Sequence, residues 1–217
     1  MIKFDWVSKY FESADWRIDI LTDASFEIPK NKFVSLMAPS WSGKTTILNI
    51  ISWLDDYQSG NIYINQKLIK HNWSDELTTR RGQNISFIFQ QFYLIPQLTV
   101  TENIDLVIDI NNLKRQFETS ELISMLWLTN RANAYPFQLS GGEQQRVAIA
   151  RAFVWDTAMI LADEPTGNLD ATNAAKIMQI IHDLHQKTNK TILMITHDKN
   201  IADQADYTIT LSNHKII

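Results

Sequence analysis

Apolar and polar residues alternate along two segments near the start of the chain, at 2–6 and at 24–28. In the first segment the apolar positions are Ile2, Phe4 and Trp6. A period of two residues is typical of a β-strand that buries only one of its faces. The pattern therefore predicts two half-buried strands in this part of the chain.

Further segments with the composition of strands follow at intervals along the sequence. They lie at 33–37, 61–67, 85–89, 159–162, 191–196 and 207–211. Between them, residues 44–54 and 173–185 carry apolar positions at the spacing of a helix. This alternation of strands and helices predicts an α/β fold, in which helices cover both faces of a largely parallel sheet.

Residues 91–155 interrupt the alternation. Their apolar residues recur at helical spacing, as at Leu122 and Leu126 or at Val147 and Ala150. We therefore predict an inserted α-helical subdomain at this point. The expected organisation is a single domain over residues 1–217, with a catalytic core of about 1–90 and 156–217 and the helical subdomain at about 91–155.

Composition narrows the class of protein. The 217 residues suffice for one α/β domain, and 45% hydrophobic with 20% charged residues is ordinary for a globular chain. A net charge of −4 argues against a nucleic-acid partner, and the lack of Cys excludes disulfides and thiolate metal sites. We expect no signal peptide, and no run approaches the ~20 apolar residues of a membrane span. A membrane role would need a partner.

A phosphate-binding loop is predicted between the strand at 33–37 and the helix that follows. Backbone N–H groups at a helix N-terminus bind phosphate, Lys44 would reach the β- and γ-phosphates, and the Thr45 hydroxyl would ligate Mg²⁺. The alternative is a helix that merely begins with Ser-Gly-Lys-Thr. The candidate nucleotide-binding residues are Ala38, Pro39, Ser40, Trp41, Ser42, Gly43, Lys44, Thr45 and Thr46.

Polar residues end three of the predicted strands, at the edge of an α/β sheet where ligands bind. Asp163 and Glu164 follow one strand, and they would hold Mg²⁺ and accept a proton from an attacking water. His197 and Gln90 follow two others, and they would contact the γ-phosphate, the metal or the water. Taken singly, the two acids are better explained as ordinary surface acids and His197 as a cap of the following helix, and the alternative for Gln90 is a loop amide.

Two glycines stand directly before a strong helical pattern. Ser140 is a good N-cap, and Glu143 three residues later completes a capping box around Gly141 and Gly142. The segment predicts a second helix N-terminus that binds phosphate. Because one nucleotide needs only one phosphate loop, a second one suggests a site shared between two molecules. A capped helix without a ligand is the alternative, but it does not explain both glycines.

Together these segments resemble the ABC ATPase family over nearly the whole chain. The resemblance rests on the signature LSGGEQQ at 139–145, on the carboxylates at 163–164, on Asn168-Leu169-Asp170, on Gln90 and on His197. It implies the P-loop ATPase sheet of this family with a small antiparallel N-terminal β part. ADEPTGNLD at 162–170 is similar to the lipoprotein-releasing, macrolide-export and cell-division subgroup.

The resemblance also implies a mechanism. Two copies, or this chain and a similar subunit, would close head to tail around two ATP molecules, and their closure would move transmembrane permease subunits from the cytoplasmic face. Thr45, Gln90 and Asp163 would hold Mg²⁺, with Glu164, His197 and Gln90 as catalytic residues. The nucleotide would contact the phosphate loop, Ser140, Gly141, Gly142, Glu143 and Asp170, and its adenine would stack on Tyr10 or, as second choice, Phe11.

The chain departs from the family at several positions where glycine is usual. Here they are Asn31, Ala38, Trp41, Ser52, Trp53, Ser86 and Trp127. Trp41 lies in the phosphate loop, and holding a bulky residue in the left-handed region costs on the order of 1–2 kcal/mol. The sequence therefore leaves two alternatives to a transport ATPase: a regulatory ATPase that signals through its membrane partner, and a degenerate scaffold that binds nucleotide weakly.

Overall fold

The chain forms two compact units. The computed structural model describes residues 1–13, 15–39, 42–69, 84–111 and 113–217. The first unit comprises 1–81 and 191–217, and the second comprises 82–190. The second unit therefore contains the predicted helical subdomain together with segments that we assigned to the catalytic core, namely the strands at 85–88 and 159–163 and the helix at 171–188. The boundaries of the helical subdomain stay a prediction.

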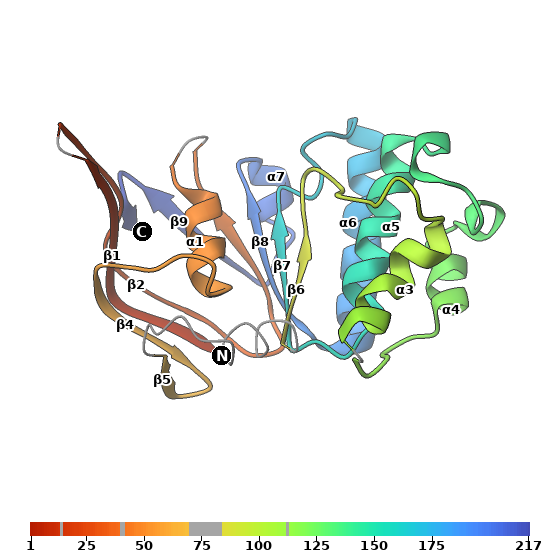
Figure 1. Ribbon diagram of the computed structural model, residues 1–217. Coiled ribbons are helices and arrows are strands. Elements are labelled where there is room, and N and C mark those ends of the chain that lie inside the picture. Colours follow the sequence, from red (N-terminus) through yellow and green to blue (C-terminus); the bar gives the residue numbers. More distant parts are fainter. Residues whose placement is uncertain (14, 40–41, 70–83, 112) are drawn as a thin grey trace. The chain divides into compact units, whose positions relative to one another are not determined.

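The first unit contains an antiparallel sheet with the strand order β2-β1-β4-β5 (Figure 1). Its strands are β1 (Ile2–Ser13), β2 (Trp16–Ile28), β4 (Ser59–Ile64) and β5 (Lys67–Ile69). The single strand predicted at 61–67 is wrong, because Asn65 and Gln66 both have positive φ, at 48° and 67°. Two such residues form the tight turn that matches the twist of a hairpin, so the segment folds back as β4 and β5.

A bulge in β1 corrects the predicted alternation. Phe4 is fully buried and stacks on Phe26, with ring centroids 4.4 Å apart. The pairing with β2 then shifts register between Phe4 and Val7, where Trp6 has φ 54°. The extra residue turns Val7 into the core and leaves Trp6 65% exposed, against the expectation that Trp6 lies on the buried face with Ile2 and Phe4.

A second set of strands in the same unit has the order β10-β9-β3-β8. Strand β3 (Phe33–Met37) runs parallel to both β8 (Thr191–Thr196) and β9 (Tyr207–Ser212), while the short β10 (Lys215–Ile216) is antiparallel to β9. Met37 pairs with Thr196, so β3 and β8 end side by side. Helices α1 (Lys44–Ile51) and α7 (Lys199–Ala202) follow these two ends. The sequence did not predict α7 and β10.

The second unit combines a parallel strand pair with helices. Strands β6 (Ile85–Ile88) and β7 (Met159–Asp163) pair in register. The helices are α3 (Val100–Asn111), α4 (Thr119–Met125), α5 (Gly141–Phe153) and α6 (Ala171–Thr188), with short 3₁₀ turns at Thr129–Arg131 and Pro136–Gln138. This confirms the helical character predicted for 91–155. Among the described residues, no helix is long and apolar enough to cross a bilayer.

Three of the positions where the resemblance leads us to expect glycine adopt the left-handed backbone conformation that glycine favours. Asn31, Trp53 and Trp127 have φ of 60°, 57° and 54°. Asn tolerates this region, whereas a bulky residue there is an outlier. Trp53 and Trp127 therefore carry local backbone strain, as does Trp6 in the bulge of β1.

Replacement of Trp127 should stabilise the protein. Because Trp127 is 65% exposed, Trp127→Asn loses little packing and relieves strain worth about 1 kcal/mol. We expect the midpoint of thermal unfolding, followed by circular dichroism, to rise by about 2–4 °C. The matched control is Trp16→Asn in strand β2, where Trp16 is 52% exposed. A midpoint that rises equally in both variants would contradict the strain at Trp127.

Candidate nucleotide site

The phosphate loop lies in the first unit, between β3 and α1. Ala38 is buried at the end of β3 and donates its N–H to the carbonyl of Thr196, at 3.3 Å. Ser42 donates both its N–H and its hydroxyl to the carbonyl of Pro39. Gly43 precedes the first turn of α1, and Lys44 and Thr45 begin that turn. The strand–loop–helix arrangement that phosphate binding requires is therefore present.

Gly43 and Ala38 differ in whether the backbone of the phosphate loop requires glycine. Gly43 has φ 85°, and a Cβ there would lie 2.3 Å from Cγ2 of Ile20. Any side chain at 43 would therefore clash. Ala38, by contrast, is not among the described residues with positive φ, so its replacement of the usual glycine costs no backbone strain. Ser40 and Trp41 lie outside the described residues, and their predicted roles stay predictions.

His197 follows β8 at the sheet edge where the phosphate loop starts. Its side chain is exposed, while the preceding strand is buried. The cap of α7 is Asp198, whose carboxylate accepts the N–H of Asn200 at 2.8 Å. The alternative explanation of His197 as a helix cap is therefore wrong, and His197 directly follows Thr196, which pairs with Met37 at the end of β3.

The two aromatic candidates for adenine contact lie on opposite faces of β1. Tyr10 pairs with Asp19 in β2, and the guanidinium of Arg17 lies over its ring at 3.9 Å. Phe11 pairs with Ile18 instead. Side chains alternate along a strand, so Phe11 and Ile18 share the face of Ile20, which contacts Gly43 of the phosphate loop.

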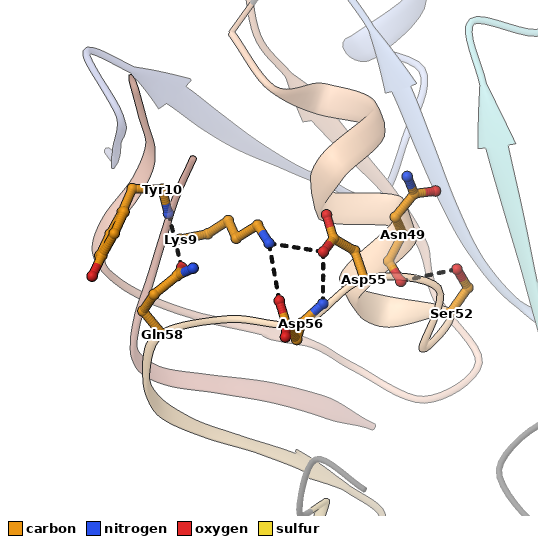
Figure 2. A network of polar contacts seen from close by, with 7 residues as sticks. All are labelled: Lys9, Tyr10, Asn49, Ser52, Asp55, Asp56 and Gln58. Carbon is orange, nitrogen blue, oxygen red and sulfur yellow. Dashed lines mark hydrogen bonds and ion pairs between the residues drawn. The ribbon is translucent and has the colours of Figure 1, made fainter. Parts of the chain in front are cut away.

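Lys9 anchors that same face to the segment after α1. Its buried ammonium contacts the carboxylates of Asp55 and Asp56, at 2.8 Å and 3.2 Å, and lies 4.6 Å from the ring centroid of Phe11. Figure 2 shows Lys9 extended toward the two acids and the ring of Tyr10 turned away from them. Phe11 rather than Tyr10 therefore lies on the face of β1 that carries Lys9. The signal that sequence reasoning missed is that Phe11 lies two residues after Lys9 in the same strand and therefore shares its face.

In the second unit, the ends of β6 and β7 bring three predicted site residues together. Ile88 pairs with Ala162, so Gln90 and the pair Asp163–Glu164 follow at one edge. A Cβ at Gly167 would lie 2.9 Å from Nε2 of Gln90 and 3.3 Å from Oε2 of Glu164. Gly167 therefore borders both side chains. Glu164 itself has φ 43°, a strained conformation typical of functional residues.

The predicted capping box at the start of α5 is confirmed. Ser140 Oγ accepts the N–H of Glu143, and Oε2 of Glu143 accepts the N–H of Ser140 at 2.8 Å. Arg131 also pairs with Glu143 at 3.0 Å. Although burial raises it, the bonds from Ser140 and Arg131 hold the pKa of Glu143 below its ordinary value. Glu143 thus fixes the N-terminus of α5, while the first N–H groups of a helix stay available to an anion.

Asp170 has a similar structural task at the start of α6. Its carboxylate accepts the N–H groups of Thr172 and Asn173, both at 3.0 Å, and the amide of Asn173. The N–H and amide of Asn173 are foremost among the bonds that lower the pKa of Asp170. Asn173 also lies close to the other helix start, because a Cβ at Gly142 would be 3.3 Å from its Oδ1. Asp170 therefore holds the glycine-rich segment and α6 in place.

The donor atoms predicted for Mg²⁺ fit that ion in kind. Thr45, Gln90 and Asp163 offer hydroxyl, amide and carboxylate oxygens, and Mg²⁺ prefers oxygen ligands and keeps several waters. Among the described residues there is no cluster of three or more His, Cys, Asp or Glu that could hold a metal ion.

Comparisons with known proteins place this site in a family. A family model described as ABC transporter matches residues 21–167. The uncharacterised ABC transporter ATP-binding protein MJ0796 of Methanocaldococcus jannaschii is 41% identical over 223 residues, which cover 100% of this chain and 95% of that protein. The lipoprotein-releasing system ATP-binding protein LolD of Bacteroides thetaiotaomicron is 36% identical over 96% of this chain and 95% of that protein.

Two further matches extend the picture. The macrolide export ATP-binding/permease protein MacB of Chlorobaculum tepidum is 37% identical over 100% of this chain, which covers 34% of that protein. The solved dimeric structure of MJ0796 in a post-hydrolysis state, bound to ADP and Pi, superposes with a TM-score of 0.86 at 39% identity, over 100% of this chain and 96% of that one.

The fold and the site define an ATP-binding cassette of the P-loop ATPase class. This chain belongs to the ABC transporter family. The fold class expected from the sequence is thereby confirmed.

Proposed function

We propose that this protein is the ATP-hydrolysing subunit of a membrane ABC transporter. The main support is the position of Gly43 and Lys44 at the start of α1, after β3, whose end pairs with the residue before His197. The chain also belongs to the ABC family. In the proposed reaction Lys44 binds the β- and γ-phosphates and Glu164 accepts a proton from the attacking water. His197 contacts the γ-phosphate. Mg²⁺, held by Thr45, Gln90 and Asp163, would neutralise charge on the phosphates.

The proposed active form is a head-to-tail dimer. Dimeric structures of the related cassette MJ0796 support self-association. In our proposal, each ATP lies between the phosphate loop of one copy and Ser140, Gly141 and Gly142 of the other. The two-fold symmetry makes both interfaces identical. The capped start of α5 supports this, because it presents N–H groups without a phosphate loop of its own.

We further propose a permease partner and a place at the cytoplasmic face of the membrane. The names of MacB and LolD support it, since one joins a cassette to a permease in one chain and the other belongs to a releasing system. A cavity of about 350 Å³ beside β6 suits a partner helix, and it is lined by aromatic residues such as Phe87, Phe89 and Tyr93. Arg151 shapes its wall by donating to the carbonyls of Phe92 and Tyr93.

Binding and hydrolysis assays test this function. Purified protein should bind ATP in a calorimetric titration and release phosphate when Mg²⁺ is present. Lys44→Ala should lose binding, because a point charge on the phosphates is removed. A wild-type protein that neither binds ATP nor releases phosphate would leave the degenerate scaffold as the better description.

We assign the adenine contact to Phe11 rather than to Tyr10. Phe11→Ala should weaken ATP binding about fivefold to 100-fold, since stacking of a base on an aromatic ring contributes ~1–3 kcal/mol. Tyr10→Ala is the matched control and should leave the ATP affinity nearly unchanged, because its ring lies on the other face of β1 under Arg17. Titration of a fluorescent ATP analogue measures both. If Tyr10→Ala weakens ATP binding more than Phe11→Ala does, Tyr10 is the residue that contacts adenine.

The predicted effect of Trp41, which lies outside the described residues, can be tested through the ATP affinity of the loop. If Trp41 forces the phosphate loop into strain, Trp41→Gly relieves about 1.4 kcal/mol and tightens ATP binding about tenfold. We expect this result because Gly43, Lys44 and Thr45 still require the usual phosphate position. Calorimetric titration compares the two proteins. An equal or weaker affinity in the variant would show that the loop has a different, unstrained shape.

A further inference from the structure

Asn168 and Gln90 are joined by a reciprocal pair of hydrogen bonds. Asn168 Nδ2 donates to the backbone carbonyl of Gln90 at 3.0 Å, and Gln90 Nε2 donates to Oδ1 of Asn168 at 3.2 Å. Both residues belong to the second unit. The first bond ties Asn168 to the main chain, and the second ties it to the side chain that we propose as a metal ligand.

These two bonds fix which atom of the Gln90 amide is left for the site. A backbone carbonyl only accepts, so Asn168 must turn its NH₂ toward it and its Oδ1 toward the Gln90 side chain. Oδ1 only accepts, so Gln90 must present Nε2 to Asn168. Its Oε1 is then the atom that Asn168 does not engage. Oxygen is the atom that a Mg²⁺ ion or the proton of a water requires.

The surroundings hold this arrangement in place. Gly167 borders the Gln90 amide and the Glu164 carboxylate, and a Cβ there would lie 2.9 Å from Nε2 of Gln90. Gly167 donates its N–H to the carbonyl of Glu164 at 3.0 Å, which closes a turn between the catalytic carboxylate and Asn168. The Gln90 side chain therefore meets the same turn that carries Glu164.

We propose that Asn168 is a positioning residue that orients the Gln90 amide so that its oxygen faces the metal and the attacking water. The inference rests on the proposed function, because it takes Gln90 to be a ligand of Mg²⁺. Asn168 touches neither nucleotide nor metal. It acts through Gln90 and couples that residue to the turn before α6.

The test compares nucleotide binding with and without the metal. The affinity for a fluorescent, non-hydrolysable ATP analogue is measured in EDTA and in excess Mg²⁺. The affinity in Mg²⁺ divided by the affinity in EDTA gives the contribution of Mg²⁺ to binding. Gln90→Ala should lower this ratio, and Asn168→Ala should lower it about threefold to tenfold while the affinity in EDTA is unchanged. The double variant should lower it no further than Gln90→Ala, because both act through one amide.

Controls separate orientation from folding. Gln179→Ala removes a surface amide of α6 that bonds to Asp183, and it should leave the ratio at the wild-type value. Asn168→Leu keeps the branched shape of the side chain without its hydrogen bonds, and it should repeat the result of Asn168→Ala, with the thermal midpoint of every variant measured alongside.

Other outcomes overturn the proposal in distinguishable ways. A normal ratio in Asn168→Ala and Asn168→Leu, with a lowered ratio in Gln90→Ala, refutes the role of Asn168 alone. Additive effects in the double variant show that Asn168 acts apart from Gln90. A normal ratio in Gln90→Ala removes Gln90 from the metal site, and with it the basis of the inference, while ATP binding in EDTA still tests the phosphate loop.

Discussion

Glu164→Gln should reduce ATP turnover by at least about 100-fold while ATP binding persists. A carboxylate that accepts a proton in the transition state contributes on the order of 10²- to 10⁴-fold to the rate, and an amide of the same shape does not accept it. Phosphate release gives the rate, and size-exclusion chromatography with ATP should show a dimer that accumulates because it no longer hydrolyses its nucleotide.

The design separates chemistry from folding. Glu164 lies beside Gly167 and has a strained backbone, so loss of activity by itself would not distinguish a lost base from a shifted turn. The matched control is Glu121→Gln, the same exchange of an acid for its amide at an exposed position in the first turn of α4. That variant should keep normal turnover, and the thermal midpoints of both variants show whether the fold is intact. Near-normal turnover in Glu164→Gln would remove Glu164 from the role of general base.

Ser140→Arg should abolish ATP-driven dimerisation and reduce hydrolysis to background. The start of α5 must approach the phosphates of the other copy in the proposed dimer, and a long cationic side chain fills that space. ATP binding to the monomer should change little, because in the proposed dimer Ser140 contacts the nucleotide held by the phosphate loop of the other copy. Analytical ultracentrifugation with and without ATP gives the oligomeric state, and calorimetry gives the affinity.

Ser140→Ala controls for the lost cap. Both variants lose the Ser140 hydroxyl that accepts the N–H of Glu143, which costs about 1 kcal/mol of stability, but only the arginine adds bulk. Ser140→Ala should therefore melt like Ser140→Arg and still dimerise, with at most about a tenfold weaker association. If Ser140→Arg dimerises on ATP as the wild type does, the shared site is wrong for this protein.

The sequence alone determined the elements and the chemistry of the strand ends. Buried strands at 33–37, 159–162 and 191–196 were predicted because uninterrupted apolar residues leave few alternatives. The capping box of Ser140 and Glu143 was also predicted, since both partners lie within one helical turn. Family membership followed from motifs whose spacing is set by one fold, and the comparisons confirm it.

Only the tertiary structure decided what depends on register or on residues distant in the sequence. The bulge at Trp6 and the turn at Asn65 change the alternation of side chains, and apolar periodicity alone does not locate an inserted residue. The assignment of Phe11 to the phosphate-loop face required the contact of Ile20 with Gly43. The pairing of Gln90 with Asn168 joins positions 78 residues apart, and it forms because β6 and β7 end together.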